Sequence, residues 1–507
     1  MSIRRQSIIS SLVIYIGFAV GLLNTYFFTT DSLAGQPLFT TTEYGLTGIF
    51  VAIATMMLAF ANLAMPTYIW KFYHYYDDFL PPRKNDMITW ALVVSTIGFV
   101  LVLVVGWILR DLVIRKFGAK SPELLSYYYW IFPMGLGLTI FAVLEAYAWN
   151  LGKPVLTNFL KEIQWRVLVT ILIVLFAVKI IPTFDLFIKL YAFTHLGIAL
   201  TLFLYLWYKG KIHLTFKISK VSRRYFRKIA MLCSFVYAST IIFTLSQVFD
   251  TIVIAAYGGI DQAGIFTLAT LMTSVIHAPQ RGVVAAAVPH LSRAWKDKNI
   301  TQIQRIYQRS SINLLIFASG IFVLIALNYT QAIITLNLKE DYLLGFNAFL
   351  VLGITRVIDL GTGVNSEIIA TSNFWRFQLI SGVVLLVLMI PLTIFLTKTY
   401  NILGPAIAGF IAISVYNSMR IIFLWKKYKL FPFTDRSLYA VITAIACWAA
   451  CHYAFLQVSG WSGMIGRSVM FVVLYGGLNV WFRLSPDIHP VVATILKKTG
   501  LRKRSES

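Results

Sequence analysis

The chain has 507 residues, of which 58% are hydrophobic and only 13% are charged, and its mean hydropathy is +0.76. Soluble globular proteins carry about 25% charged residues, so the composition excludes a soluble multidomain protein and a disordered chain. Three cysteines exclude a disulfide-rich secreted scaffold. The composition therefore predicts an all-α polytopic membrane protein.

Apolar segments long enough to cross a bilayer recur along the whole chain, since about 20 residues span its hydrocarbon core as a helix. We predict fourteen spans, which are Ile8–Phe28, Tyr44–Met65, Ile88–Ile108, Tyr127–Tyr147, Leu160–Ile181, Leu186–Trp207, Ile229–Ala256, Gly264–Val288, Ile312–Tyr329, Tyr342–Ala370, Phe377–Thr397, Ile402–Trp425, Leu438–Val458 and Met464–Phe482. The segments between them are too short for a soluble catalytic domain. We therefore expect a function carried out within the membrane, and a transporter rather than an enzyme.

The distribution of Lys and Arg predicts the orientation, because cytoplasmic loops carry most of these residues. One alternating set of connecting segments holds about 34 of them, including the group from Arg420 to Arg436, and the opposite set holds about nine. Both termini are therefore expected in the cytoplasm, and nucleic acid is not needed to explain a net charge of +24. The basic segment Arg110–Lys120 lies on the outer side without explanation.

The longest basic stretch divides the spans into two sets of six, with two more at the end. The predicted domains are an N-terminal lobe at 1–210, a basic cytoplasmic linker at 211–228, a C-terminal lobe at 229–428, two further spans at 429–483 and a basic tail at 484–507. Similar short motifs recur at the ends of spans in both lobes, for example Met65-Pro66 at the end of the second span and Val288-Pro289 at the end of the eighth. This pattern predicts a pseudo-twofold repeat around a central cavity, with chance similarity of apolar segments as the alternative.

Several segments of the sequence are similar to one family of membrane proteins. They are Thr42–Phe50 (TEYGLTGIF), Gly258–Phe266, Ala278-Pro279 with His290-Leu291-Ser292, Asp359–Glu367 and Asn401–Gly409. The chain resembles the polysaccharide-exporter branch of the multidrug/oligosaccharidyl-lipid/polysaccharide flippase superfamily over essentially its whole length. One departure is Phe266, at a position where the family often has Tyr.

The resemblance implies a secondary transporter of the bacterial inner membrane. Members of this branch flip undecaprenyl-diphosphate-linked oligosaccharides, the repeat units of O-antigen, capsule or exopolysaccharide, to the outer leaflet by alternating access. The expected partners are this lipid-linked substrate and membrane lipids, with anionic head groups against the basic linker and tail. Docking of a polysaccharide polymerase or a glycosyltransferase is a further expectation.

Cationic side chains at bilayer depth are the candidates for binding a diphosphate, because a charge facing lipid is costly and marks a cavity or a partner. His277 and Arg281 lie four residues apart on one face of the eighth span, and Arg356 lies near the middle of the tenth. We expect these three to contact the diphosphate or the first sugar. The alternatives are an interfacial position for Arg281, a salt bridge from Arg356 to Asp359, and packing roles for His277 and for His195 in the sixth span.

Carboxylates within the spans are the candidates for coupling to Na⁺ or H⁺ or for gating, and no other cofactor is expected. They are Asp250, Asp359, Glu145 and Glu367. Around Asp359, Gly361, Gly363 and Asn365 favour a locally unwound helix that exposes carbonyl groups, as in the ion sites of transporters. The alternative is that both glycines only allow close helix packing. No GxxxxGKS or GxxxxGKT motif is present, so ATP hydrolysis by this chain is not expected.

Three competing functions stay open. A cation-coupled multidrug exporter of the same superfamily fits the four carboxylates, although Arg281 and Arg356 favour an anionic substrate. A lipid II flippase differs mainly in the head group that it carries. A membrane glycosyltransferase or polymerase is disfavoured, because the outer loops are too short to build a sugar-binding domain.

Overall fold

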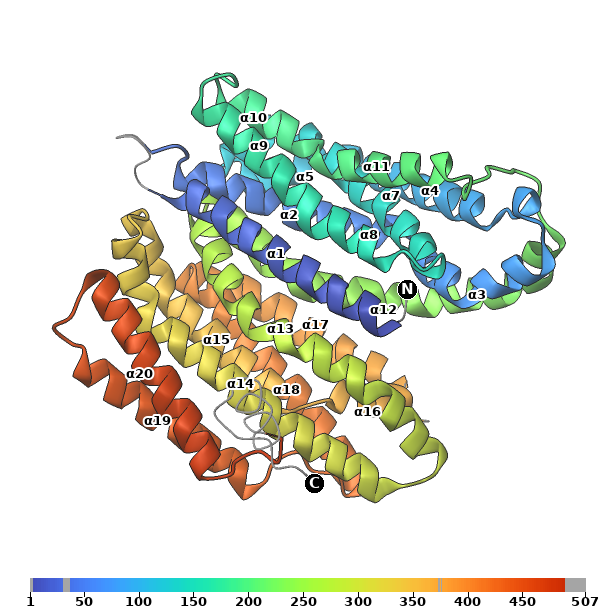
Figure 1. Cartoon of the computed structure of the whole chain (residues 1–507). Helices are drawn as coiled ribbons and strands as arrows, with labels where there is room; N and C mark the ends of the chain where they lie inside the picture. The colour runs from blue at the N-terminus through green and yellow to red at the C-terminus, as the bar shows by residue number, and fades with distance from the viewer. Residues whose placement is uncertain (1–2, 31–36, 373, 375, 488–507) are drawn as a thin grey trace. The chain divides into compact units, whose positions relative to one another are not determined.

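The computed structural model describes residues 3–30, 37–372, 374 and 376–487. The described part is all-helical, and it divides into two compact units, Met1–Gly264 and Ile265–Ser507 (Figure 1). The predicted fold class, a polytopic bundle of membrane-spanning helices, is confirmed. The boundary between the units falls at the beginning of helix α13.

Helices of the N-terminal unit follow the predicted spans closely. They are α1 (Ile3–Thr29), α2 (Thr41–Ala61), α3 (Met65–Phe79), η1 (Pro82–Lys84), α4 (Met87–Ile108), α5 (Arg110–Phe117), α6 (Pro122–Ser126), η2 (Tyr128–Trp130), α7 (Ile131–Asn150), α8 (Pro154–Asn158), η3 (Phe159–Gln164), α9 (Trp165–Ala177), α10 (Phe184–Ala192), α11 (Thr194–Tyr208) and α12 (Lys220–Tyr257). The predicted sixth span is divided between α10 and α11.

The helices of the C-terminal unit also follow the predicted spans, and one predicted span is interrupted. They are α13 (Ile260–Lys296), which begins just before the boundary, α14 (Ile300–Thr335), η4 (Glu340–Gly345), α15 (Phe346–Gly361), α16 (Asn365–Thr371), α17 (Arg376–Tyr400), α18 (Leu403–Tyr428), α19 (Asp435–Ala454) and α20 (Gly460–Trp481). The predicted tenth span is broken between α15 and α16.

Each of the fourteen predicted spans coincides with a helix or a pair of helices. Among the described residues, eleven helical segments are long and apolar enough to cross a membrane, and Val13–Thr29 is a shorter apolar helix. Three helices extend well past their predicted spans, since α12, α13 and α14 contain 38, 37 and 36 residues. At 1.5 Å per residue each is longer than the roughly 30 Å of hydrocarbon. The second half of the basic linker, from Lys220, is therefore the first part of α12.

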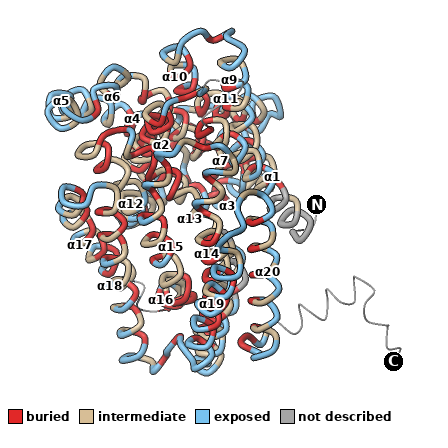
Figure 2. The backbone as a smooth tube through the Cα atoms, turned by 90° about the vertical axis from the view of Figure 1, so that its left-hand side faces the viewer, coloured by how far each residue is buried: buried red, intermediate tan, exposed pale blue. Residues whose placement is uncertain are grey.

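The core of the N-terminal unit forms around α7, which packs against α2, α3, α4 and α11. Buried residues are concentrated along α2 and α7 (Figure 2). Gly137 of α7 lies against the backbone of His195 and Leu196 in α11, so any side chain at this position would collide with it. This close approach is typical of helices that associate within a membrane, where small residues let backbones meet.

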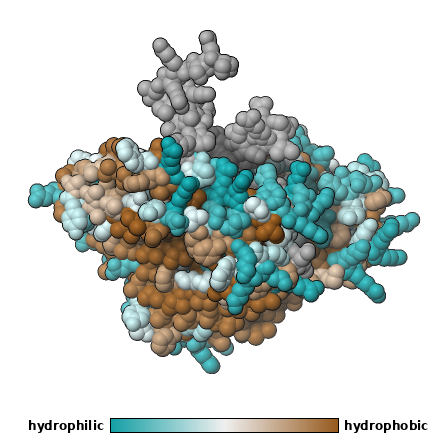
Figure 3. Space-filling model, turned by 90° about the horizontal axis from the view of Figure 1, so that it is seen from below, coloured by the Kyte–Doolittle hydropathy of each residue, from teal (hydrophilic) through white to brown (hydrophobic). Residues whose placement is uncertain are grey.

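The core of the C-terminal unit forms around α14, which packs against α15, α19 and α20, while α18 packs against α15 and α17. Large apolar side chains also remain outside both cores, and Val469, Val472 and Val473 of α20 are 57–66% exposed. One face of the molecule shows broad apolar surface beside clustered hydrophilic side chains (Figure 3). Such an apolar exterior fits contact with lipid rather than with water.

Candidate functional site

The interruption between α15 and α16 is the structural centre of the candidate site. Gly363, in the non-helical segment after Gly361, has a φ of +68°, a conformation that favours glycine. The carbonyl groups here are already occupied: Ser311 Oγ donates to the Gly361 oxygen at 2.5 Å, and the Gly363 N–H donates to the Leu360 oxygen at 2.9 Å. The predicted break in the helix is confirmed, but these carbonyls bind protein donors.

Close packing also explains both glycines. A Cβ atom on Gly361 would lie 3.0 Å from Leu315, and one on Gly363 would lie 2.8 Å from Ser310 Oγ and 2.9 Å from the Ser311 backbone nitrogen. All three neighbours belong to α14. Both sequence-based interpretations of these glycines therefore hold. The glycines allow the helix to break, and they allow the chain to pack closely against α14.

Asp359 lies at the centre of a polar network beside this break. Its Oδ1 accepts a hydrogen bond from Asn417 Nδ2 of α18 at 2.8 Å, and its Oδ2 lies 3.5 Å from His277 Nε2 of α13. Asn417 Oδ1 in turn accepts from Asn365 Nδ2 at 3.1 Å and from Thr362 Oγ1 at 3.3 Å. The structure thus brings together three predicted site residues, His277, Asp359 and Asn365, and adds Asn417.

Arg356 lies one turn before Asp359 on α15 and is partly buried. Within the described part of the chain, its guanidinium has no carboxylate partner within 4 Å, so the alternative of a salt bridge to Asp359 is not formed. The positive charge of Arg356 contributes to the electrostatic environment of Asp359 without contacting it. Arg356 is therefore a cation within a predicted span that forms no ion pair with a carboxylate among the described residues.

Arg420 of α18 is the main residue that sequence reasoning missed. We counted it among the charges of a connecting segment, and this is wrong, because Arg420 lies within α18 and is only 2% exposed. Its Nη1 donates to Asn365 Oδ1 at 3.5 Å, its Nε donates to Ser381 Oγ at 3.4 Å, and its guanidinium lies 3.8 Å from the centre of the Tyr416 ring. Its place inside the predicted span Ile402–Trp425 was the available signal.

Buried polar atoms of three residues in or near this network have no hydrogen-bond partner within the described residues. They are Nη2 of Arg420, Oε2 of Glu367 and Nε2 of His277. Arg420 and Glu367 interact electrostatically but form no ion pair within 4 Å. Arg467 of α20 shows the contrast, since this buried arginine donates to the carbonyl oxygens of Leu327, Val458 and Gly463. Arg420 therefore belongs to a network with unused hydrogen-bonding capacity, and Arg467 does not.

Of the remaining predicted residues, Glu145, Asp250 and His195 belong to the N-terminal unit and Arg281 lies on α13. In the N-terminal unit, Glu145 of α7 lies 3.6 Å from Lys161 Nζ. Asp250 lies on α12 and is partly buried. His195 is 7% exposed and packs against Trp165, with ring centres 4.8 Å apart, which fits the packing role. Arg281 follows His277 by one turn on α13, and its side chain lies outside the described residues.

The fold can be compared with known proteins at this point. No family model and no curated protein matches the chain. Among solved structures, the lipid II flippase MurJ in an inward closed conformation is similar with a TM-score of 0.72 at 16% identity, covering 94% of this chain and 99% of MurJ. The chain has the MurJ fold.

Transporters of the MATE family share this architecture. An inward-facing multidrug resistance MATE transporter of the MOP superfamily gives a TM-score of 0.62 at 17% identity, over 83% of this chain and 99% of that one. A MOP superfamily transporter from Pyrococcus furiosus gives 0.53 at 16% identity, over 88% and 96%. The comparisons therefore confirm the superfamily fold that the sequence resemblance implied, and they do not distinguish the polysaccharide branch.

Proposed function

We propose that the chain is a secondary transporter that flips a polyprenyl-diphosphate-linked oligosaccharide across the bacterial inner membrane by alternating access, with both termini in the cytoplasm. The observation that carries this proposal is Arg356, a partly buried cation at membrane depth without an ion-pair partner among the described residues. An unpaired charge there is costly, so it indicates a water-filled path or an anionic ligand. The similarity to MurJ, a lipid II flippase, supports a lipid-linked anionic substrate.

The proposed role of the network follows from its contacts. A diphosphate carries about two negative charges, and Arg binds phosphate through paired N–H donors. Arg356 would make that contact, with His277 and Arg281 on α13 as further ligands. Because His277 is only 3.5 Å from Asp359, a phosphate that drew the imidazole away would release the Asp359 carboxylate. Substrate arrival would in this way change the network that joins α13, α15 and α18.

We further propose that the coupling ion is H⁺ rather than Na⁺. Asp359 Oδ1 accepts a hydrogen bond from Asn417 Nδ2, and its Oδ2 lies 3.5 Å from His277 Nε2, so nitrogen atoms face both carboxylate oxygens, whereas a hard cation requires several oxygen ligands. The unmatched Oε2 of Glu367 is compatible with a protonated acid, which needs no counter-charge. Asp359 and Glu367 are thus the proposed proton carriers.

Two other substrates remain as second candidates, each favoured by a specific similarity. Lipid II is favoured by the TM-score of 0.72 with MurJ, and an organic cation is favoured by the MATE transporters. Lipid II and a polysaccharide precursor share the diphosphate and differ in the sugars beyond it. An organic cation would instead require a carboxylate that is available to bind it, whereas Asp359 already accepts a hydrogen bond from Asn417 and lies 3.5 Å from His277.

The experiment that tests the proposal is the identification of the lipid-linked intermediate that accumulates when the gene is deleted. Mass spectrometry of extracted lipids should find a polyprenyl diphosphate that carries an oligosaccharide, and restoring the gene should remove it. Accumulation of lipid II would select the second candidate. An unchanged lipid profile together with greater sensitivity to cationic drugs would contradict both lipid substrates.

A further inference from the structure

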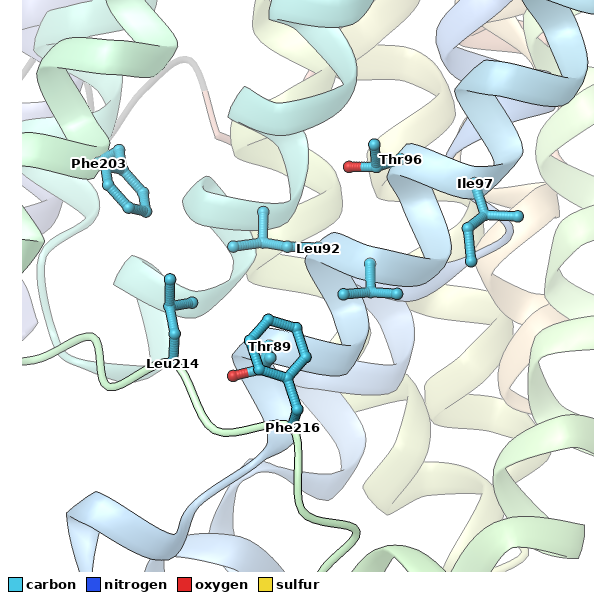
Figure 4. A pocket seen from close by; sticks show the side chains of 8 residues that line it. Thr89, Leu92, Thr96, Ile97, Phe203, Leu214 and Phe216 are labelled. Atoms are coloured by element: carbon cyan, nitrogen blue, oxygen red, sulfur yellow. The ribbon is translucent and has the colours of Figure 1, made fainter.

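An apolar pocket of about 310 Å³ opens on the N-terminal unit, far along the chain from the polar network of the C-terminal unit. Thr89, Thr96 and Ile97 of α4, Phe203 of α11, and Leu214 and Phe216 of the segment that follows α11 line it (Figure 4). Large apolar side chains that line the pocket are exposed at the protein surface. Phe216 is 68% exposed and Ile97 is 54% exposed. Apolar surface of this kind marks a site for an apolar partner.

The segment between α11 and α12 carries both apolar and basic side chains at its surface. Leu214, Phe216 and Ile218 are 44%, 68% and 59% exposed, and Lys211 and Lys217 are exposed as well. No acidic residue occurs anywhere from 209 to 228. The segment therefore presents exposed apolar side chains together with positive charge that no neighbouring acidic residue in the sequence offsets.

Hydrogen bonds hold this segment firmly against the helices. Thr89 Oγ1 accepts from the Thr215 backbone N–H at 3.0 Å, and the Tyr147 hydroxyl donates to the Lys211 carbonyl oxygen at 2.9 Å. At the segment's end, Asp86 Oδ2 accepts from the Ser219 N–H at 2.8 Å. The pocket wall that Leu214 and Phe216 supply is therefore fixed in place, and the outward position of these side chains is part of the fold.

We propose that this pocket binds an acyl chain of an anionic phospholipid, with the phosphate of that lipid near Lys211 and Lys217. The charge of the segment selects an anionic head group, and the apolar lining selects its chain. The α4 lining from Thr89 to Ile97 rises about 12 Å from the predicted cytoplasmic end of the span, within the roughly 15 Å of one leaflet. That depth suits a phospholipid chain, whereas a long polyprenyl chain would extend past it.

The bound lipid would anchor the connection between α11 and α12 to the inner leaflet. This inference is independent of the transported substrate, because it concerns a lipid that stays in place. It adds a binding site for an acyl chain to the contact with anionic head groups that is expected for the basic linker.

A photoactivatable probe tests the proposal on the full chain in vesicles. The probe is phosphatidylglycerol with a diazirine on its acyl chain, present as a minor lipid among phosphatidylcholine, and labelled peptides are mapped by mass spectrometry. Labelling should concentrate on 89–97 and 214–216. Thr96→Phe, an exposed lining position that the larger side chain would fill, should lower this labelling about tenfold, because a displaced chain forfeits the burial of several methylene groups.

Matched variants separate this site from ordinary lipid contact. Leu101→Phe adds an aromatic ring at another exposed position of α4, outside the pocket, and should leave the labelling unchanged. Lys211→Gln combined with Lys217→Gln should remove the preference for phosphatidylglycerol over a phosphatidylcholine probe, and the same two changes at Arg223 and Arg224 should not. The charge variants leave the helices intact, so they test the proposal even if Thr96→Phe fails to fold.

Three results would overturn the proposal. The first is uniform labelling along the exposed face of α4, and the second is equal labelling by the two probes in the unaltered chain, since both describe ordinary lipid around a membrane protein. The third is loss of labelling when a polyprenyl phosphate is added at low concentration, which would assign the pocket to a different chain.

Discussion

Glu145 in the N-terminal unit and Glu367 in the C-terminal unit occupy similar places in the sequence, each five residues before a small polar residue near the predicted cytoplasmic end of a span. Their surroundings differ. Glu145 has a lysine partner, Lys161, which is 54% exposed, while Glu367 lies beside a buried arginine with one oxygen unmatched. The comparison teaches that two carboxylates in similar sequence surroundings can differ in tertiary contacts, since one forms a partly exposed ion pair and the other is buried with an oxygen that has no hydrogen-bond partner among the described residues.

The largest expected effect concerns Arg356, the proposed ligand of the diphosphate in the C-terminal unit. Arg356→Gln should reduce flipping of the lipid-linked substrate by about a hundredfold in vesicles, because a charge-assisted contact to the diphosphate is lost. Arg356→Lys should retain part of the activity, and Lys426→Gln at an exposed end of α18 should retain all of it. Arg281→Ala is expected to act like Arg356→Gln. Wild-type flipping in both Arg281→Ala and Arg356→Gln would remove these residues from the site.

The next effect concerns the stability of the network around Arg420. Arg420→Ala should destabilise the chain by about 3 kcal/mol, since it removes the contacts with Asn365, Ser381 and the Tyr416 ring and leaves a cavity among buried polar groups. Thermal unfolding of the purified protein in detergent measures the change. Arg420→Met combined with Glu367→Gln should recover part of the loss. A stability equal to that of the unaltered chain after Arg420→Ala would mean that this charge has no structural role.

Proton coupling makes a direct comparison of the two glutamates informative. Glu367→Gln and Asp359→Asn should each remove the dependence of transport on a pH gradient, with a rate loss of about tenfold. Glu145→Gln should keep this dependence, and its cost in stability should stay below about 1 kcal/mol, as for a partly exposed ion pair. Transport in vesicles under opposed pH gradients provides the measurement. Equal behaviour of all three variants would remove the proposed difference between the units.

The smallest effect lies outside the membrane spans, where Asp487 pairs with Arg309. The Arg309 guanidinium holds the pKa of the Asp487 carboxyl below its usual range, and Asn313 assists. This depressed pKa gives stability that is present above the usual carboxyl pKa of about 3.9 and lost as pH falls through the folded value. Asp487→Asn should cost less than about 1 kcal/mol at neutral pH because both groups are partly exposed. A larger loss would show a structural role for this contact.

Much of the fold was accessible from the sequence because the signal for a span is local. A run of apolar residues identifies a helix without knowledge of its neighbours, and the glycines at 361 and 363 identified the break in the tenth span. The ends of the long helices were less accessible. Lys220–Lys228 is polar and basic, which is equally typical of a loop and of a helix that extends into water. In the structure it is helical, and Ser222 Oγ lies 2.7 Å from the Tyr76 hydroxyl of α3.

The candidate site was only partly accessible, for a physical reason. Asp359 and His277 stand out as charges inside apolar runs, but Arg420 lies five residues before the end of its span, where an arginine ordinarily reaches the interface. Its burial depends on Ser381, Asn365 and Tyr416, which come from other parts of the chain or from the preceding helical turn. No pattern in the sequence marks Asn417 as a residue of the site. Side-chain networks of this kind depend on tertiary packing.

The most direct test of the central claim uses the purified chain in vesicles that contain a fluorescent polyprenyl-diphosphate-linked oligosaccharide in one leaflet. A membrane-impermeant quencher reports how much of the head group reaches the other leaflet. We predict that the unaltered chain transfers the head group and that Arg356→Gln does not. Equal transfer by both proteins, or no transfer by a folded unaltered chain that instead moves an organic cation, would contradict the account.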